Sequence, residues 1–265
     1  MKRIFLKLGG SLITDKHLSR TPRRDTIRRL ANEINLAMRS SPNFQLIIGH
    51  GSGSFGHIPA SKYGTRKGVR TTEQWQGFIE VFRQARELNQ IVLDILGEAG
   101  LPVIAFPPSA CIFADDGQVS SMNPDPFRSA LNAGLIPLVN GDVVFDRARG
   151  ATILSTEDVF VALADFFTPD AILLCGMDEG VFEDFPQCTR LISNITYLNK
   201  DEIFSRLGGS AAIDVTGGMV EKVRLMLAMV ERIPSVQASI FSGNVTGNLQ
   251  DALIGKEVGT TIRRE

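Results

Sequence analysis

Two glycine-rich segments near the start of the chain combine backbone freedom with side chains that can carry charge. The first, KLGGSLITDK, spans residues 7–16 and has a lysine at each end. The second, HGSGSFGH, spans residues 50–57 and has a histidine at each end. Each segment follows or ends an apolar run typical of a buried strand. Both turns are therefore expected at the carboxyl ends of strands, where backbone N–H groups and helix starts favour phosphate.

A dinucleotide site is the first alternative, because Gly51, Gly53 and Gly56 form a literal G-x-G-x-x-G. Dinucleotide-binding folds also need an acid at the end of the next strand, about 20 residues beyond the glycines. In this chain that window is TTEQWQGFIEVF, whose pattern predicts a helix rather than a strand. We therefore favour two phosphate cradles facing each other, an arrangement that suits phosphoryl transfer from a nucleotide to an acceptor. Plain tight turns remain an alternative for either segment.

Three lysines lie beside glycine turns. Lys7 lies in an otherwise apolar strand, which suggests that it points off the strand end toward a phosphate. Lys16 follows the first turn, and Lys222 follows the segment DVTGGM. That segment offers a helix cap and two glycines that allow an anion to approach: Thr216, Gly217 and Gly218. Three such lysines could neutralise the charge on a moving phosphoryl group, although ordinary surface charge remains an alternative for Lys16 and Lys222.

His57 and His50 flank the second glycine turn. A histidine just past glycines at a helix start can donate to a phosphate, and a protonated one also neutralises it. For His57 a structural role, satisfied by the backbone, remains the alternative. His50 lies at the end of the apolar run, so we predict that it packs or forms the turn.

The elements that would position these residues alternate between short strands and longer helices, which predicts a mainly parallel sheet covered by helices. Strands are predicted at 3–8, 44–49, 102–106, 136–140, 171–175 and 237–241. Helices are predicted at 22–39, 72–99, 124–133, 157–167, 200–207 and 217–232. The pieces DVVFD and ATILS predict a hairpin, and hence an antiparallel element on the sheet.

Composition excludes several classes of partner. The chain has 265 residues, 43% of them hydrophobic, and a net charge of −1, so we expect neither nucleic acid nor a membrane surface as partner. Its three cysteines are widely spaced and predict reduced thiols in a cytoplasmic protein. The apolar run at the start is too short for a secretion signal, and no window reaches the roughly 20 apolar residues of a membrane helix.

With these motifs assembled, the chain resembles the amino acid kinase superfamily, and within it the members that phosphorylate isopentenyl phosphate. The resemblance runs nearly end to end, through KLGGSLITDK, HGSGSFGH, NGDVVFD, DVTGGM and GTTI. It implies an open αβα sandwich of one domain, residues 1–265, and usually a homodimer. The acceptor would bind the half at about 1–170 and ATP with Mg²⁺ the half at about 171–265. ATP and isopentenyl phosphate would give ADP and isopentenyl diphosphate by direct in-line transfer, with no dedicated protein metal site.

The resemblance also assigns roles to individual residues. Lys7 would contact the transferring phosphoryl group, Lys16 and Lys222 would hold ATP phosphates, and His57 would bind the acceptor's phosphate. The other residues on the ATP side would be Gly9, Gly10, Ser11, Asp178, Gly180, Thr216, Gly217 and Gly218. Those on the acceptor side would be Gly51, Ser52, Gly53, Gly56, Gly141 and Asp142.

The chain departs from the family pattern at two places. Where the family commonly has SGD, with an aspartate that orders the lysines, this chain has LSTEDV. Glu157 falls at the aspartate's position, and the adjacent Asp158 is the alternative. The nucleotide-side pattern TDVDG is replaced by GMDEG, which leaves the contacts of the base and ribose near Asp178 and Gly180 open.

An acceptor with a five-carbon tail also needs an apolar wall. The segment WQGFIEVF places Trp75, Phe78, Ile79 and Phe82 at helical spacing, as a stripe that could face such a tail or form ordinary core. Two other functions remain open. One is a related kinase for another small phosphate or phosphonate, and the other is a nucleotide-binding regulatory or storage protein that lost turnover.

Overall fold

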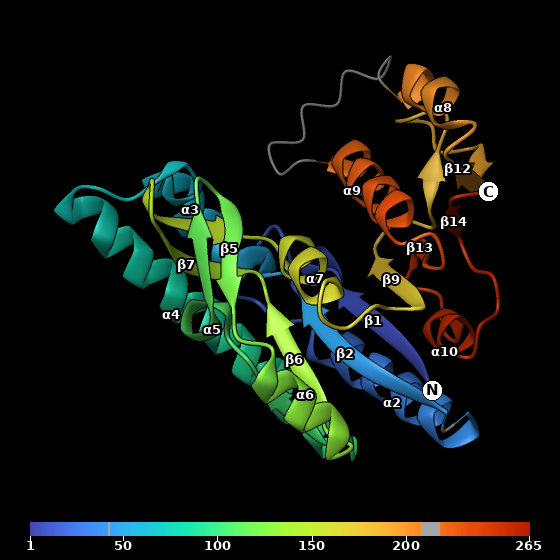
Figure 1. Ribbon diagram of the computed structural model, residues 1–265, viewed down its shortest axis with the longest axis horizontal. Coiled ribbons are helices and arrows are strands. Elements are labelled where there is room, and N and C mark those ends of the chain that lie inside the picture. Colours follow the sequence, from blue (N-terminus) through green and yellow to red (C-terminus); the bar gives the residue numbers. More distant parts are fainter. Residues whose placement is uncertain (42, 208–217) are drawn as a thin grey trace.

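One large sheet runs through the molecule, with helices on both of its faces (Figure 1). The computed structural model describes residues 1–41, 43–207 and 218–265. The eight strands lie in the order β12 (Asn194–Thr196), β14 (Thr260–Arg263), β13 (Gln237–Ser242), β9 (Ala171–Gly176), β1 (Lys2–Leu8), β2 (Phe44–His50), β6 (Ile136–Asn140) and β3 (Val103–Ala105). All neighbours are parallel except β13 and β14. The predicted α/β class with a mostly parallel sheet is confirmed.

The two strands that lead into the glycine turns are neighbours at the centre of this sheet. β1 and β2 pair in parallel, with Lys7 opposite Gly49 and Leu8 opposite His50. On its other side β1 pairs in parallel with β9. Parallel neighbours end at the same edge of a sheet, so both glycine turns begin side by side, as the sequence predicts.

Strand alternation divides the core between the two faces. Ile4, Leu6 and Leu8 of β1 point to one face, where α2 (Arg24–Ser40), α4 (Thr72–Glu98) and α10 (Asn248–Leu253) pack. Phe5 points to the opposite face, where α6 (Asp125–Asn132), α7 (Thr156–Ala164) and α9 (Gly218–Arg232) pack. Because side chains alternate along a strand, Lys7 lies on the same face as Phe5. It is therefore directed toward the helices that carry Glu157 and Lys222.

The predicted hairpin is confirmed, but its predicted location is wrong. β7 (Asp142–Asp146) and β8 (Gly150–Leu154) pair antiparallel. They belong to a separate four-stranded sheet in the order β5 (Gln118–Met122), β4 (Ile112–Asp115), β7 and β8. The chain leaves the main sheet at Gly141, directly after β6, so the hairpin extends beyond the sheet edge instead of adding to it.

The remaining elements are short, apart from one helix that the sequence does not predict. They are α1 (Gly10–Ile13), α3 (Gly53–Tyr63), a 3₁₀ turn (Thr65–Lys67), α5 (Pro108–Cys111), β10 (Val181–Phe182), β11 (Leu191–Ile192) and α8 (Lys200–Leu207). Helix α3 was missed because it contains Gly53, Gly56 and Pro59, which disfavour helix. Packing against α4 overrides this local preference.

Two further predictions concern the division of the chain into two halves and membrane-spanning helices. The main sheet continues across β9 and β1, so no break in pairing marks residue 170; the division into an acceptor half and a nucleotide half stays a prediction. Across residues 1–41, 43–207 and 218–265, no helix is long and apolar enough to cross a membrane.

A buried carboxylate joins α2 to the C-terminal part of the chain. Glu33 is 5% exposed and pairs with Arg29, at 2.6 Å between Nη1 and Oε1. Its other oxygen accepts the N–H groups of Leu249 and Gln250 at the start of α10, at 3.2 and 3.4 Å. Arg29 in turn donates to the carbonyl oxygen of Gly243, just beyond β13. The Arg29–Glu33 ion pair therefore provides hydrogen-bond partners for backbone groups at the start of α10 and in the loop after β13, more than two hundred residues away in sequence.

Replacing Glu33 with alanine should lower the free energy of unfolding by about 3 kcal/mol or more, because Arg29 and two N–H groups lose their partner in a buried setting. Urea unfolding measures this directly. Asp25→Ala is the matched control, since Asp25 pairs with Arg28 on the same helix but its side chain is fully exposed; it should change stability by less than about 0.5 kcal/mol. Equal effects of the two substitutions would contradict the role given to Glu33.

Candidate functional site

A buried ion pair lies at the carboxyl end of β1. The ammonium of Lys7 donates to Oε1 of Glu157, which is the second residue of α7. The side chains of Lys7 and Glu157 are 14% and 8% exposed. Strand alternation directs Lys7 to this face, and the start of α7 places Glu157 opposite it.

The charges around Glu157 keep it ionised. Burial opposes ionisation, but the charge and hydrogen bond of Lys7 outweigh it, and the charge of Lys222 adds to their effect; the pKa of Glu157 therefore lies below its ordinary value. Lys222 lies in the second turn of α9 and is half-buried. The structure thus brings Lys7, Glu157 and Lys222 into one electrostatic cluster, although they are far apart in sequence.

The two adjacent acids of LSTEDV have different partners. Asp158 accepts hydrogen bonds from the N–H and the hydroxyl of Ser155, both at 2.8 Å, and the Ser155 hydroxyl accepts the N–H of Asp158. This is a capping box that begins α7. The position opposite Lys7 is occupied by Glu157, and Asp158 stabilises the helix start that holds it there.

The two glycine turns pack backbone against backbone. A Cβ atom at Gly10 would lie 2.5 Å from the amide nitrogen of Gly53, and one at Gly51 would lie 2.8 Å from the amide nitrogen of Gly10. Gly53 also has φ +48°, in the left-handed region that favours glycine. Side chains at these positions would force the turns apart. The glycines therefore place the amides of the first turn directly beside those of the second.

Thr14 fastens the two turns together. Its buried hydroxyl donates to the carbonyl of Gly10 at 2.8 Å and accepts the N–H of Ser54 at 3.0 Å. The first N–H groups of a helix have no acceptor within the helix. The N–H group of Ser54 donates to Thr14. The N–H groups of Ser52 and Gly53 have no acceptor among residues 1–41, 43–207 and 218–265. Such amides can bind an anion. The sequence did not single out Thr14.

His57 and His50 occupy different environments. His57 lies in the second turn of α3 and is exposed. His50, the last residue of β2, is fully buried and contacts Asn89 of α4. His50 thus packs at the turn, in agreement with the prediction for it, while His57 is at the surface beside the glycine turn.

The segment after β6 packs beside the second glycine turn. The N–H of Gly141 donates to the carbonyl of His50 at 3.1 Å, so this loop lies against the second glycine turn. The carboxylate of Asp142 is 3% exposed and accepts the N–H groups of Val143 and Ser109, at 2.9 and 3.4 Å. Burial raises the pKa of Asp142 to about 6, although hydrogen bonds from Ser109 and Val143 partly oppose this rise.

An aromatic cluster extends from α4 to the second sheet. The ring centroid of Phe78 lies 5.3 Å from that of Trp75 and 5.5 Å from that of Phe145, which is 45% exposed. Phe82 and Phe78 precede Asn89 by 7 and 11 positions, so by helix period they share its face of α4. Since Asn89 contacts His50, this face of α4 leads toward the second glycine turn.

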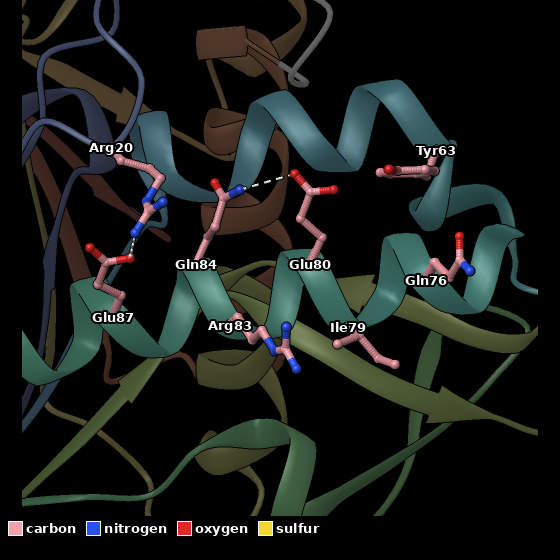
Figure 2. Close-up of a pocket in the computed structure, with 8 residues that line it drawn as sticks. All are labelled: Arg20, Tyr63, Gln76, Ile79, Glu80, Arg83, Gln84 and Glu87. Carbon is pink, nitrogen blue, oxygen red and sulfur yellow. Dashed lines mark hydrogen bonds and ion pairs between the residues drawn. The ribbon is translucent and has the colours of Figure 1, made fainter.

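The opposite flank of α4 forms a polar pocket that the sequence did not predict (Figure 2). Its volume is about 600 Å³, and it is lined by Arg20, Tyr63, Gln76, Ile79, Glu80, Arg83, Gln84 and Glu87. Arg20 pairs with Glu87, and Gln84 donates to Glu80 (Figure 2). Ile79, expected in the aromatic stripe, lies in this pocket and is 46% exposed, because it is offset from that stripe around the helix. The grouping of Ile79 with the three aromatic residues was wrong.

The predicted ATP-side residues are more dispersed. Ser11 and Lys16 are exposed, in α1 and in the loop beyond it, and Asp178 is exposed after β9. Gly180 is buried, with no room for a side chain: a Cβ atom there would lie 2.5 Å from Oγ1 of Thr260, in the GTTI segment. Gly9 donates its N–H to the carbonyl of Cys175 in β9. Gly218 begins α9, whereas Thr216 and Gly217 lie outside the described residues.

No cluster of three or more His, Cys, Asp or Glu side chains in the described part of the chain is arranged to hold a metal ion.

Comparisons with known proteins identify the family of this chain. The model of the amino acid kinase family matches residues 2–242. An isopentenyl phosphate kinase from Methanothermobacter thermautotrophicus is 36% identical over 271 residues, 98% of each chain. One from Methanocaldococcus jannaschii is 32% identical over 264 residues, 97% of each chain. A solved isopentenyl phosphate kinase structure superposes with a TM-score of 0.83 at 32% identity, covering 98% of this chain and 99% of that one.

The raised pKa of Asp142 predicts how stability depends on pH. At pH values between the ordinary pKa of an aspartate and about 6, Asp142 holds a proton in the folded protein but has lost it in the unfolded chain. The free energy of unfolding therefore falls as the pH rises through this range. The Asp142→Asn variant has no carboxyl group at this position, so it does not show this fall in the free energy of unfolding. Its stability relative to the wild type should therefore increase from pH about 4 to about 7, by up to roughly 3 kcal/mol.

Urea unfolding across that pH range measures the difference. Asp115→Asn is the control, because Asp115 is exposed on the neighbouring β4; its stability should run parallel to that of the wild type. A parallel course for Asp142→Asn as well would refute the burial effect.

Proposed function

Because this chain belongs to the amino acid kinase family, we propose that it is an ATP-dependent kinase that converts isopentenyl phosphate to isopentenyl diphosphate. The observation that carries the proposal is the meeting of two amide-lined glycine turns beside the Lys7–Glu157 pair. Relatives that match nearly the whole chain bear this activity in their names. The activity would place the protein in isoprenoid biosynthesis.

The proposed reaction is a direct in-line transfer. An oxygen of the acceptor's phosphate attacks the γ-phosphorus of ATP, and the bond from that phosphorus to the ADP oxygen breaks. Such a reaction needs positioning and charge neutralisation more than it needs covalent help. Lys7 supplies positive charge to the moving group, and the hydrogen bond to Glu157 orients the Lys7 side chain. Lys16 and Lys222 hold the ATP phosphates in this proposal.

The acceptor's phosphate would lie against the turn at Gly51, Ser52, Gly53 and Gly56, with His57 as a hydrogen-bond donor. Within the described ranges, no acceptor pairs with the N–H groups of Ser52 and Gly53, and His57 is exposed; both observations support this placement. The five-carbon tail would lie along the aromatic face of α4, against Phe82 and Phe78. Of the eight residues that line the pocket on the other flank of the helix, six have charged or amide side chains, so the aromatic face is the better match for such a tail.

Several parts of the proposal rest on the family alone. ATP would bind to the half of the sheet that begins with β9, near Gly9, Gly10, Ser11, Asp178, Gly180, Thr216, Gly217 and Gly218. Mg²⁺ would arrive with ATP, held by phosphate oxygens, and would neutralise phosphate charge there. Gly141 and Asp142 would close the acceptor side. We further propose a cytoplasmic homodimer.

A turnover panel tests the proposed function. The purified protein should release ADP with isopentenyl phosphate, and more slowly with dimethylallyl phosphate, a short alkylphosphonate or N-acetylglutamate. A preference for the phosphonate would indicate a kinase for another small anion. A preference for the carboxylate of N-acetylglutamate would contradict the role of His57, and no acceptor-dependent ADP release would favour a protein that binds nucleotide without turnover.

His57→Ala should raise the KM for isopentenyl phosphate by about 10- to 100-fold, because a charge-assisted hydrogen bond to the phosphate is lost. The kcat should change far less, since Lys7 and the glycine turns remain. His17→Ala is the matched control, at an exposed histidine in the loop after α1. If both variants keep the wild-type KM, His57 does not bind the acceptor.

A further inference from the structure

His50 occupies a central position at the acceptor side of the sheet edge. It is the last residue of β2 and fully buried. It alternates with Leu46 and Ile48, so its ring points to the face covered by α4. A buried histidine needs hydrogen-bond partners for both ring nitrogens, and His50 has both.

The two partners define where the ring proton lies. Nδ1 is 3.1 Å from the carbonyl oxygen of Gly51, and Nε2 is 2.9 Å from Nδ2 of Asn89. A carbonyl oxygen can only accept, so Nδ1 must carry the proton. Nε2 is then an acceptor, which matches the amide N–H that Asn89 donates. One neutral tautomer of His50 therefore satisfies both the hydrogen bond to Gly51 and the one from Asn89.

The backbone of His50 makes two further links. Its carbonyl oxygen accepts the N–H of Gly141 at 3.1 Å and the hydroxyl of Thr156 at 2.7 Å. Thr156 directly precedes Glu157 at the start of α7. His50 therefore connects the second glycine turn, the Gly141 loop, α4 and the helix that carries the partner of Lys7.

We propose that His50 is a positioning residue for the acceptor, which fixes the peptide between Gly51 and Ser52 through its Nδ1–H. Glycine at position 51 is required by the close approach of Gly10, but glycine also leaves this peptide free to rotate. In a trans peptide the N–H points opposite to the C=O. Holding the Gly51 carbonyl toward His50 thus directs the Ser52 N–H to the opposite side, where the proposed function places the acceptor's phosphate.

The environment keeps this imidazole neutral. Burial disfavours the charged form of His50, and so does the positive charge of Lys7, whereas the hydrogen bond to the Gly51 carbonyl favours that form. The net effect lowers the pKa of His50 to about 4. At neutral pH the ring therefore keeps one donor and one acceptor and adds no charge beside Lys7. This distinguishes it from His57, whose proposed role is to contact the phosphate itself.

Imidazole ¹⁵N NMR on the whole protein tests the protonation state directly, because the chain has three histidines, His17, His50 and His57. Assignment by His17→Ala and His57→Ala leaves the resonances of His50. We expect a neutral ring protonated on Nδ1 that does not titrate between pH about 5 and about 8. A ring protonated on Nε2, or one that titrates near the ordinary histidine pKa of about 6.5, would overturn the assignment.

Kinetics with isopentenyl phosphate test the positioning role. His50→Leu, made together with Asn89→Leu so that no buried amide is left without a partner, should raise the acceptor KM about 10-fold, with a smaller change in kcat. His50→Asn should recover part of this loss, because the asparagine Nδ2 can replace Nδ1 as donor to Gly51. A packing role alone would lower stability without this rescue.

Asn35→Leu serves as the matched control. Asn35 lies on α2 and donates to the carbonyl of Ala99, just past the end of α4. This variant should lower the unfolding midpoint and leave the acceptor KM unchanged. If the His50→Leu/Asn89→Leu variant also keeps the wild-type KM, the positioning role is refuted. If the wild type itself does not use isopentenyl phosphate, the proposed function fails instead, and the NMR result still decides the state of His50.

Discussion

The organisation of the site depends on one buried ion pair, between Lys7 and Glu157. An ammonium group inside a sheet is costly unless it is paired and hydrogen-bonded. The pairing requires β1 to present Lys7 on one face and α7 to begin opposite it, with its first turn set by the capping box of Ser155 and Asp158. Glu157 carries one methylene more than an aspartate, and it still reaches Lys7. The charge of Lys222 also acts on Glu157, which draws α9 into the same arrangement.

The second constraint is the absence of side chains at the meeting of the two glycine turns. Gly10, Gly51 and Gly53 approach one another so closely that a Cβ atom at any of them would meet backbone atoms or Thr14. This close approach brings the amides of the two turns together but also removes side chains that would otherwise fix the backbone. Thr14 on one side and His50 on the other supply that stiffness through hydrogen bonds. The site thus combines glycines where the two turns meet with the buried polar side chains of Thr14 and His50, which hold the backbone of the turns in place.

Local patterns in the sequence were sufficient for the central part of this arrangement. The strand pattern predicted that β1 and β2 end in glycine turns, because apolar runs followed by glycines mark the carboxyl ends of buried strands. Contacts between distant segments were not predictable in the same way. Glu33 meets Leu249 across 216 positions, and the reach of Asn89 to His50 depends on how α4 crosses the sheet. Helix α3 was hidden by its own glycines and proline, whose local cost is offset by packing against α4. Strands β4 and β5 of the second sheet escaped prediction because they are short and partly exposed.

The rate of phosphoryl transfer in a single turnover tests the central claim most directly. ATP and isopentenyl phosphate would be mixed with excess wild-type enzyme or with Lys7→Ala, and Lys2→Ala, at the exposed start of the same strand, would serve as the control. Because Glu157 would otherwise keep an unpaired buried charge, Lys7→Ala would also be made together with Glu157→Gln. Removing the ammonium of Lys7 should slow the transfer step about 10²- to 10³-fold while acceptor affinity changes little. A transfer rate within a few-fold of the wild type in both Lys7 variants would contradict the account.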